Sequence, residues 1–219
     1  MSLLDTIFSL HIETSTSLCS VSIGMNNLCI DTIETEDRQS HSERLHTFIQ
    51  QIMNKHALSF SRLHVVAVSA GPGSYTGLRI GAATAKTIAY AMHIPLVDIS
   101  SLHTLAWAYI FNHAPSPSVY IAAVMPARGK KIYLGVYDYQ GKEQIAPCSF
   151  LVHEENLIQL KNQFKHKELI FVGKDTIVDA LLVPYVCVCL SSKFMTEEVY
   201  RRYQRRQFAS SVYFEPLYL

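Results

Sequence analysis

The chain has 219 residues and a formal net charge of +1 at pH 7, with 49% hydrophobic and 17% charged residues. This composition is typical of a folded globular protein, and it excludes an intrinsically disordered chain and a strongly basic, stand-alone nucleic-acid-binding module. No segment reaches the roughly 18 consecutive apolar residues of a membrane span, so we expect a soluble protein without membrane contacts.

The first segment, FSLHIETS, alternates apolar and polar residues and predicts a strand. The preceding residues include Asp5 and no basic cluster, so we expect no signal peptide and a cytoplasmic location. LCSVSIG and LCIDTIETE follow, separated by a turn at residues 25–27, which predicts an antiparallel meander. SHSERLHTFIQQIMNKH then predicts an amphipathic helix, whose apolar positions are Leu45, Phe48, Ile49, Ile52 and Met53.

The next segment, LHVVAVSAG, is a continuous apolar run that favours a central, buried strand. It leads through the turn GPGSYTG into the Ala-rich sequence LRIGAATAKTIAYAMH, which predicts a helix with Thr76 as a candidate N-cap. IPLVDIS predicts a further strand, and SLHTLAWAYIFNH predicts another helix.

HAPSPS has the composition of a linker, and after it the pattern repeats. The expected strands are VYIAAVMPA, KKIYLGVYDYQGK, EQIAPCSFLV, ELIFVG and PYVCVCL, and the expected helices are HEENLIQLKNQFK, KDTIVDALL and KFMTEEVYRRYQRRQF. This order predicts a duplicated α/β fold, like the ribonuclease-H-like halves of the actin, hexokinase and Hsp70 ATPase (ASKHA) group. We expect two domains, residues 1–113 and 114–219, with the last helix packing back on the first domain.

The glycine-rich stretch from Gly71 to Gly81 has the strand-turn-helix setting of an anion-binding loop. It lacks the Lys of a P-loop, and Thr76 stands where the dinucleotide fingerprint G-x-G-x-x-G requires its third glycine. A purely structural turn and an anion site both remain open. If a phosphate or nucleotide binds, the candidate contacts are Glu13, Thr14, Ser15, Gly71 and Gly73.

Small side chains dominate the helix after this turn, so another element can approach its surface closely. The pattern leaves open whether that element belongs to the same chain or to a partner. The small residues are Gly81, Ala82, Ala83, Ala85, Ala89 and Ala91.

We expect no metal site. His41 and His46 are five residues apart, about 140° around a helix, and do not share a face. Cys187 and Cys189 lie on one face of their strand without a second ligand pair, so we expect buried thiols. No G-x-S-x-G nucleophile motif is present. The last helix is basic and aromatic, which favours either a solvated face or a local RNA contact, through Tyr200, Arg201, Arg202, Tyr203, Arg205 and Arg206.

One resemblance covers essentially the whole chain. SAGPGSYTGLRIG resembles the signature of the bacterial TsaB (YeaZ) family, and IETSTSLCSVSIG, SHSERLHTFI, PARGKKIYLGVYD and FEPLYL are similar to further family segments in the same order.

The resemblance implies a non-catalytic scaffold subunit of the complex that transfers a threonylcarbamoyl group from threonylcarbamoyl-AMP to N6 of adenosine 37 in tRNAs reading ANN codons. It implies a TsaD-like catalytic paralogue and a TsaE-like ATPase as partners, a homodimer in isolation, tRNA contact only within the complex, and no cofactor. The family docks through its first two helices, which here implies partner contacts at His41, Glu43, Leu45, Phe48, Ile49, Ile52, Thr76, Leu78, Arg79, Gly81, Ala82, Ala85 and Ala89.

Two departures weaken a nucleotide or metal site, because the family commonly has Asp in place of Glu13 and in place of Pro126. In addition, VGKD at Gly173 is poor in glycine for an adenosine site. The alternative is an independent ASKHA-fold enzyme, either a kinase-like phosphotransferase or a glycoprotease-like hydrolase, with Glu13 as its carboxylate.

Overall fold

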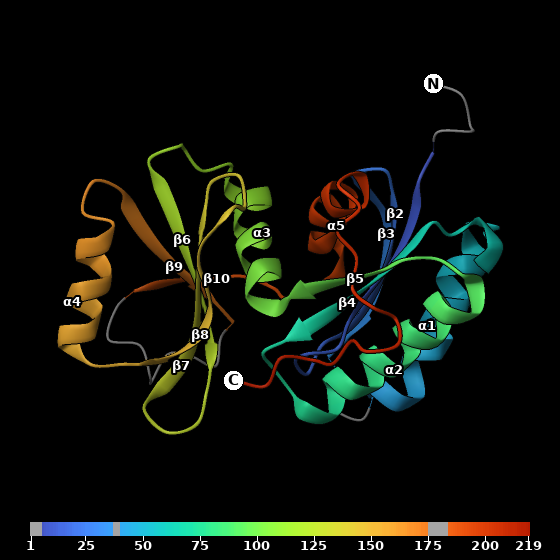
Figure 1. Cartoon of the computed structure of the whole chain (residues 1–219), viewed down its shortest axis with the longest axis horizontal. Coiled ribbons are helices and arrows are strands. Elements are labelled where there is room, and N and C mark those ends of the chain that lie inside the picture. Colours follow the sequence, from blue (N-terminus) through green and yellow to red (C-terminus); the bar gives the residue numbers. More distant parts are fainter. Residues whose placement is uncertain (1–5, 37–39, 175–183) are drawn as a thin grey trace. The chain divides into compact units, whose positions relative to one another are not determined.

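The computed structural model describes residues 6–36, 40–174 and 184–219, and the structural statements below refer to these residues. The chain forms two compact units (Figure 1): unit 1 contains residues 1–101 and 191–218, and unit 2 contains residues 102–190 and 219. The domain boundary expected at residue 113 lies inside unit 2. The last helix belongs to unit 1.

Unit 1 contains a five-stranded sheet in the order β3-β2-β1-β4-β5. The predicted meander is confirmed, because the first three strands pair antiparallel, whereas β4 and β5 join the sheet in parallel. The strands are β1 (Phe8–Glu13), β2 (Cys19–Met25), β3 (Leu28–Thr35), β4 (Val65–Gly71) and β5 (Leu96–Ser100).

Two helices cover one face of this sheet and a third helix covers the other. α1 (Ser40–Lys55) and α2 (Tyr75–Met92) pack on the face that carries Leu10, Ile12 and Val68. α5 (Thr196–Gln204), preceded by the 3-10 turn η4 (Ser192–Met195), packs on the opposite face. β4 contributes alternate residues to two cores, with Val66 and Val68 on one face and Val65 and Ala67 on the other, as the period-two geometry of a strand requires. A short 3-10 turn, η2 (Phe60–Arg62), precedes β4.

The chain of unit 1 ends in a tail, residues 205–218. The predicted last helix extended to Phe208, whereas α5 ends at Gln204. The N–H of Ala209 donates to the carbonyl of Leu96 at 2.9 Å, so the tail covers part of the edge strand β5. Farther along, Phe214 is buried in the core with α1 and α2, and the N–H of Leu217 donates to the carbonyl of Ala70 at 2.7 Å. The tail is therefore an integral part of unit 1.

Unit 2 contains a second five-stranded sheet in the order β10-β9-β6-β7-β8. Its first three strands again form an antiparallel meander, and β9 and β10 are parallel additions. The elements of this half are α3 (Ser101–His113), β6 (Val119–Pro126), β7 (Lys131–Asp138), β8 (Glu143–Leu151), α4 (Glu154–Gln163), β9 (Glu168–Gly173) and β10 (Tyr185–Cys187). The expected helix KDTIVDALL lies almost wholly outside the described residues.

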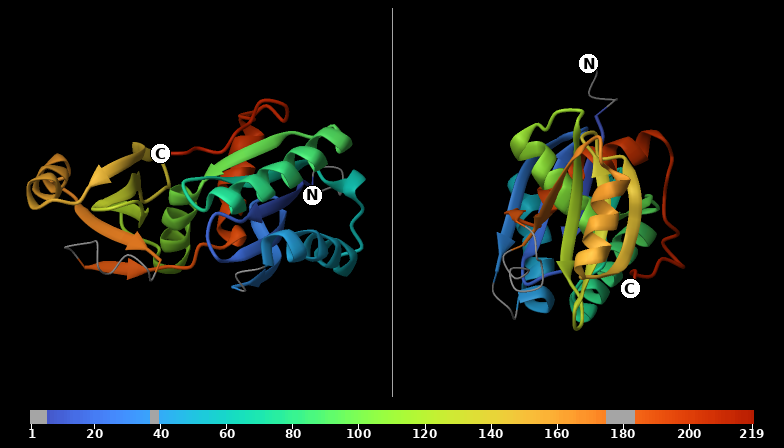
Figure 2. Two further views of the ribbon diagram at one scale, coloured as in Figure 1. Left: turned by 90° about the horizontal axis from the view of Figure 1, so that it is seen from below. Right: turned by 90° about the vertical axis from the view of Figure 1, so that its left-hand side faces the viewer.

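The two sheets have the same strand order when each is counted from its own first strand. In both units the helix after the meander packs on the sheet, α1 in unit 1 and α4 in unit 2. Figure 2 shows the ribbon of each unit from two further directions. This repetition confirms the predicted duplicated ribonuclease-H-like α/β fold. Among the described residues, no helix has the length and apolar composition needed to cross a bilayer.

Candidate functional site

The glycine-rich turn connects β4 to α2. Ser74 is the N-cap of α2, because its side-chain oxygen accepts the N–H of Gly77 at 3.2 Å, so the expected cap at Thr76 is wrong. Gly71 has φ of +94°, and a Cβ there would lie 2.7 Å from the carbonyl oxygen of Leu217. Both the backbone conformation and the approach of the tail thus require glycine at this position.

The small residues of α2 allow its first turns to lie directly on the end of β1. A Cβ at Gly77 would collide with the carbonyl oxygen of Thr14, and a Cβ at Gly81 would collide with the Thr14 hydroxyl. The sequence left open whether an element of the same chain or of a partner approaches the small residues of this helix. For Gly77 and Gly81, the structure favours an element of the same chain.

The carboxyl group of Glu13 is fully buried at the end of β1. The N–H of Ser15 donates to its Oε1 at 2.6 Å, whereas Oε2 has no hydrogen-bond partner among the described residues. Burial raises the pKa of Glu13 to about 7, and hydrogen bonds from neighbouring residues oppose that rise only in part. A buried carboxyl of this kind is half protonated near neutral pH.

The other candidate phosphate contacts are also engaged within unit 1. Thr14 and Ser15 are buried, and the carbonyl of Ser15 accepts the N–H of Ser74 at 2.7 Å. Gly73 is exposed and lies against Ser15, while Gly71 lies under the tail. The N–H groups of Ser74 and Gly77, which an anion site would use, already have acceptors inside the chain.

The residues expected at the docking face divide into buried and accessible groups. Nine of them lie in the interior of unit 1, because the apolar stripes of α1 and α2 pack against the sheet. The buried residues are Leu45, Phe48, Ile49, Ile52, Leu78, Gly81, Ala82, Ala85 and Ala89, and the accessible ones are His41 (half-buried), Glu43, Thr76 and Arg79.

The outward faces of α1 and α2 differ in character. The exposed side chains described for α1 are polar, and they are Ser42, Glu43, Arg44, His46, Thr47, Gln50, Gln51, Asn54 and Lys55. The exposed side of α2 combines aromatic, cationic and small residues, and includes Tyr75, Thr76, Arg79, Ala83, Thr87 and Tyr90.

Neither the histidines nor the cysteines form a metal centre in the described part of the chain, which contains no group of three His, Cys, Asp or Glu side chains placed to hold an ion. Cys187 and Cys189 are exposed, so the expectation of buried thiols is wrong for both. β10 is short and, among the described residues, pairs only with β9 at the edge of its sheet.

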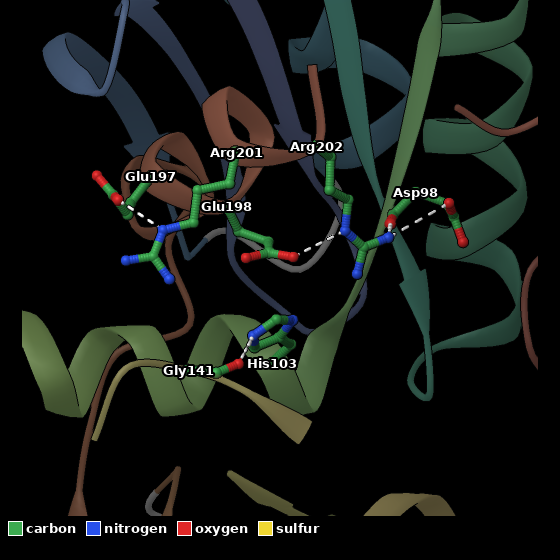
Figure 3. Close-up of polar contacts among 7 residues, drawn as sticks. All are labelled: Asp98, His103, Gly141, Glu197, Glu198, Arg201 and Arg202. Carbon is green, nitrogen blue, oxygen red and sulfur yellow. Dashed lines mark hydrogen bonds and ion pairs between the residues drawn. The ribbon is translucent and has the colours of Figure 1, made fainter. Parts of the chain in front are cut away.

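The arginines of α5 mostly serve the fold of unit 1. Arg201 pairs with Glu197 at 2.8 Å, and Arg202 pairs with Glu198 at 2.9 Å and donates to the carbonyl of Asp98 at 2.8 Å (Figure 3). These contacts favour the reading of a solvated, ion-paired face for the first two arginines. Arg205 and Arg206 are exposed.

Two histidines, one in each unit, are buried and hydrogen-bonded. His11 is fully buried in β1, with its ring nitrogens 3.0 Å from Ser22 Oγ and 2.8 Å from Ser9 Oγ, and burial lowers its pKa to about 3. In unit 2, His103 lies 2.7 Å from the carbonyl oxygen of Gly141 (Figure 3) and stacks on Tyr137. Alternation along FSLHIE could have placed His11 on one face of the strand, but no sequence signal gives its partners.

Comparisons with known proteins give a consistent answer. A family model described as TsaD, tRNA N6-adenosine threonylcarbamoyltransferase, matches residues 33–213. The tRNA threonylcarbamoyladenosine biosynthesis protein TsaB of Bacillus subtilis is 32% identical over 170 residues, covering 76% of this chain and 71% of that protein. TsaB of Escherichia coli is 28% identical over 162 residues, covering 71% and 68%.

The solved structure of YeaZ from Pseudomonas aeruginosa has the same fold. It superposes with a TM-score of 0.77 at 19% identity, covering 97% of this chain and 100% of that one. The family-model match, the TsaB relatives and this shared fold agree along most of the sequence. The chain therefore belongs to the TsaB (YeaZ) family.

Proposed function

We propose that the chain takes part in threonylcarbamoyladenosine modification of tRNA as a non-catalytic scaffold subunit. Its complex transfers a threonylcarbamoyl group from threonylcarbamoyl-AMP to N6 of adenosine 37 in tRNAs reading ANN codons. The proposal extends the names of the TsaB relatives to this chain. A cytoplasmic location belongs to the same proposal.

The observation that best supports a non-catalytic role is the state of Glu13. Glu13 is the residue that the sequence analysis names as the carboxylate of an alternative ASKHA-fold enzyme, and such an enzyme would need this carboxylate to be accessible. Its side chain is fully buried, and its pKa is raised to about 7 because burial disfavours the charged form. A carboxyl enclosed in this way is poorly placed to hold a metal ion or to meet a substrate.

The partners belong to the proposal as well. We assign catalysis to a TsaD-like paralogue and ATP hydrolysis to a TsaE-like protein, with tRNA bound only by the complete complex and a homodimer formed when the chain is alone. Docking uses the helical face of unit 1, where the accessible candidates are His41, Glu43, Thr76 and Arg79. The buried positions of α1 and α2 support this face from beneath.

Reconstitution tests the scaffold role directly. The purified paralogue, the ATPase and unmodified tRNA are incubated with threonylcarbamoyl-AMP, with and without this chain, and modified adenosine is quantified by mass spectrometry. We expect product only when the chain is present. Product formed at the same rate without the chain would contradict the proposal.

Glu13→Gln separates the scaffold from the alternative enzyme. The variant keeps the shape of the side chain and removes the carboxylate, so a scaffold retains full activity in the reconstituted complex, whereas an enzyme that depends on Glu13 loses it. Calorimetry of the isolated chain with ATP and magnesium is the second measurement. We expect no heat of binding, and micromolar affinity would favour the enzyme.

A further inference from the structure

The hairpin formed by β6 and β7 in unit 2 has a loop rich in cations. We call residues 127–131, with the sequence ARGKK, the basic hairpin loop. Figure 1 shows this loop at the lower end of unit 2. Its cations are Arg128, Lys130 and Lys131, and residues 99–137 contain no Asp or Glu. The loop therefore lies in a stretch of the chain whose only charged side chains are positive.

The cationic side chains of this loop are accessible from solvent. Arg128, Lys130 and Lys131 are exposed, and across the described part of the chain none of them forms an ion pair. The arginines of α5 differ, because Arg201 and Arg202 pair with carboxylates of their own helix. The charge of the basic hairpin loop can therefore attract an anionic ligand from solution.

Backbone hydrogen bonds hold the loop in place. The N–H of Ala127 donates to the carbonyl of Lys131 at 3.3 Å, and the N–H of Val152, just after β8, donates to the carbonyl of Lys130 at 2.9 Å. Gly129 has φ of +68°, which suits glycine, and a Cβ there would have no atom within 4 Å. The loop thus projects into open space and presents its cations on a fixed backbone, which lowers the entropic cost of binding.

The composition of the loop indicates a phosphate backbone rather than a protein surface as the ligand. Protein interfaces have an apolar core enriched in aromatic residues. The loop has no large apolar side chain, and beside it Leu151, which pairs with Lys131, is 48% exposed. Contacts with nucleic-acid phosphates depend mainly on Lys and Arg. Three exposed cations with one apolar neighbour fit this second pattern.

We propose that the basic hairpin loop binds the phosphate backbone of tRNA within the complex. The inference rests on the proposed function and adds a direct contact between this chain and the RNA. Arg128, Lys130 and Lys131 neutralise phosphates, so the contact is independent of base sequence. The whole chain has a net charge of only +1, so the loop contributes to RNA affinity together with the other subunits and not alone.

Charge reversal in the loop provides the test. The chain is assembled with its TsaD-like paralogue and the TsaE-like protein, and binding of fluorescently labelled, unmodified tRNA is followed by anisotropy. The variant is Lys130→Glu, and the matched control is Lys165→Glu, at an exposed position between α4 and β9. Because β9 runs parallel to β6, Lys165 lies at the opposite end of the same sheet. We expect Lys130→Glu to weaken tRNA binding by at least about fivefold, and Lys165→Glu by less than about twofold.

The salt dependence of binding identifies the phosphate contact. The logarithm of the association constant falls linearly with the logarithm of the salt concentration, and each phosphate contact adds about one to the slope. Combined replacement of Arg128, Lys130 and Lys131 by Ala should make the slope shallower by about two to three. Arg128→Lys should bind as the wild type does, because lysine also neutralises a phosphate, whereas a bidentate contact with a guanine base would be lost.

The outcomes separate this inference from the proposed function. If the wild-type chain and the paralogue do not associate, the scaffold function is wrong and the inference falls with it. If they associate, but Lys130→Glu leaves tRNA affinity and salt slope unchanged or Lys165→Glu is the more damaging variant, the scaffold function stands and the loop contact is wrong. Calorimetry measures the affinity of each variant for the paralogue, which we expect to stay unchanged. A loss of that affinity would show that the loop binds protein, and it would overturn the RNA contact.

Discussion

Replacing Glu13 by Gln is expected to change how the stability of the chain depends on pH. Burial raises the pKa of this carboxyl from its ordinary value of 4.5 to about 7. Between these values the unfolded chain has released the proton and the native chain keeps it, so rising pH favours unfolding by about 1.4 kcal/mol per pH unit. The stability contributed by protonated Glu13 is thus complete below pH 4.5 and is lost above pH 7, a total of about 3 kcal/mol.

His11 acts in the opposite direction over part of this range. Burial lowers its pKa from 6.5 to about 3, so the unfolded chain takes up a proton below pH 6.5 that the native chain does not bind. Its contribution to stability is present above pH 6.5 and is lost as pH falls toward 3. The two residues therefore offset each other in the wild type between pH 4.5 and 6.5, and only a comparison of variants separates them.

Urea denaturation followed by circular dichroism at pH 4.5 to 8.5 makes this comparison. We expect the free energy of unfolding of Glu13→Gln, minus that of the wild type, to rise by about 3 kcal/mol across this range. Glu155→Gln, at an exposed position of α4, controls for the loss of a carboxyl in general. Fluorescence of Trp107, a residue of unit 2 and the single tryptophan, reports whether that unit unfolds in the same transition. A difference that does not change with pH would refute the reasoning.

Three substitutions test the packing of unit 1 by the free energy of unfolding. Leu45→Ala should lower the free energy of unfolding by about 2–5 kcal/mol, because the Leu45 side chain is fully buried. His46→Ala, at an exposed position, is the control, and equally small effects of both variants would contradict the burial of Leu45. Gly77→Ala should cost more than about 1 kcal/mol because its Cβ would meet the Thr14 carbonyl, whereas Thr76→Ala on the same turn should cost little. Phe214→Ala should cost about 3 kcal/mol and Tyr213→Ala almost nothing, and the reverse order would contradict the anchoring of the tail.

Local patterns were sufficient to predict most of the fold. The alternation in FSLHIETS, the turn at Asn26 and the helical spacing from Leu45 to Ile52 each depend on a few neighbouring residues, and the structure has the corresponding elements. The cap of α2 was misplaced because Ser74 and Thr76 are both good capping residues, and only the hydrogen bond to Gly77 identifies Ser74.

The site was harder to predict because it depends on contacts between distant residues. Periodicity indicates that Ile52 lies on the apolar face of α1 and Ala85 on the apolar face of α2. It does not indicate whether a sheet of the same chain or a partner covers each face. The Tyr75 and Tyr218 rings lie 5.0 Å apart although about 140 positions separate the two residues, and no local pattern encodes that contact.

Light scattering of the purified chain, alone and then mixed with its TsaD-like paralogue, tests the scaffold role most directly. Mass is measured across a chromatographic peak, so the composition of any complex is read without a label. We predict that the mixture contains a heteromeric complex, and that Arg79→Glu, an exposed substitution on the proposed docking face of unit 1, disrupts its formation. Two separate peaks with the masses of the isolated proteins, over a range of protein and salt concentrations, would contradict the account.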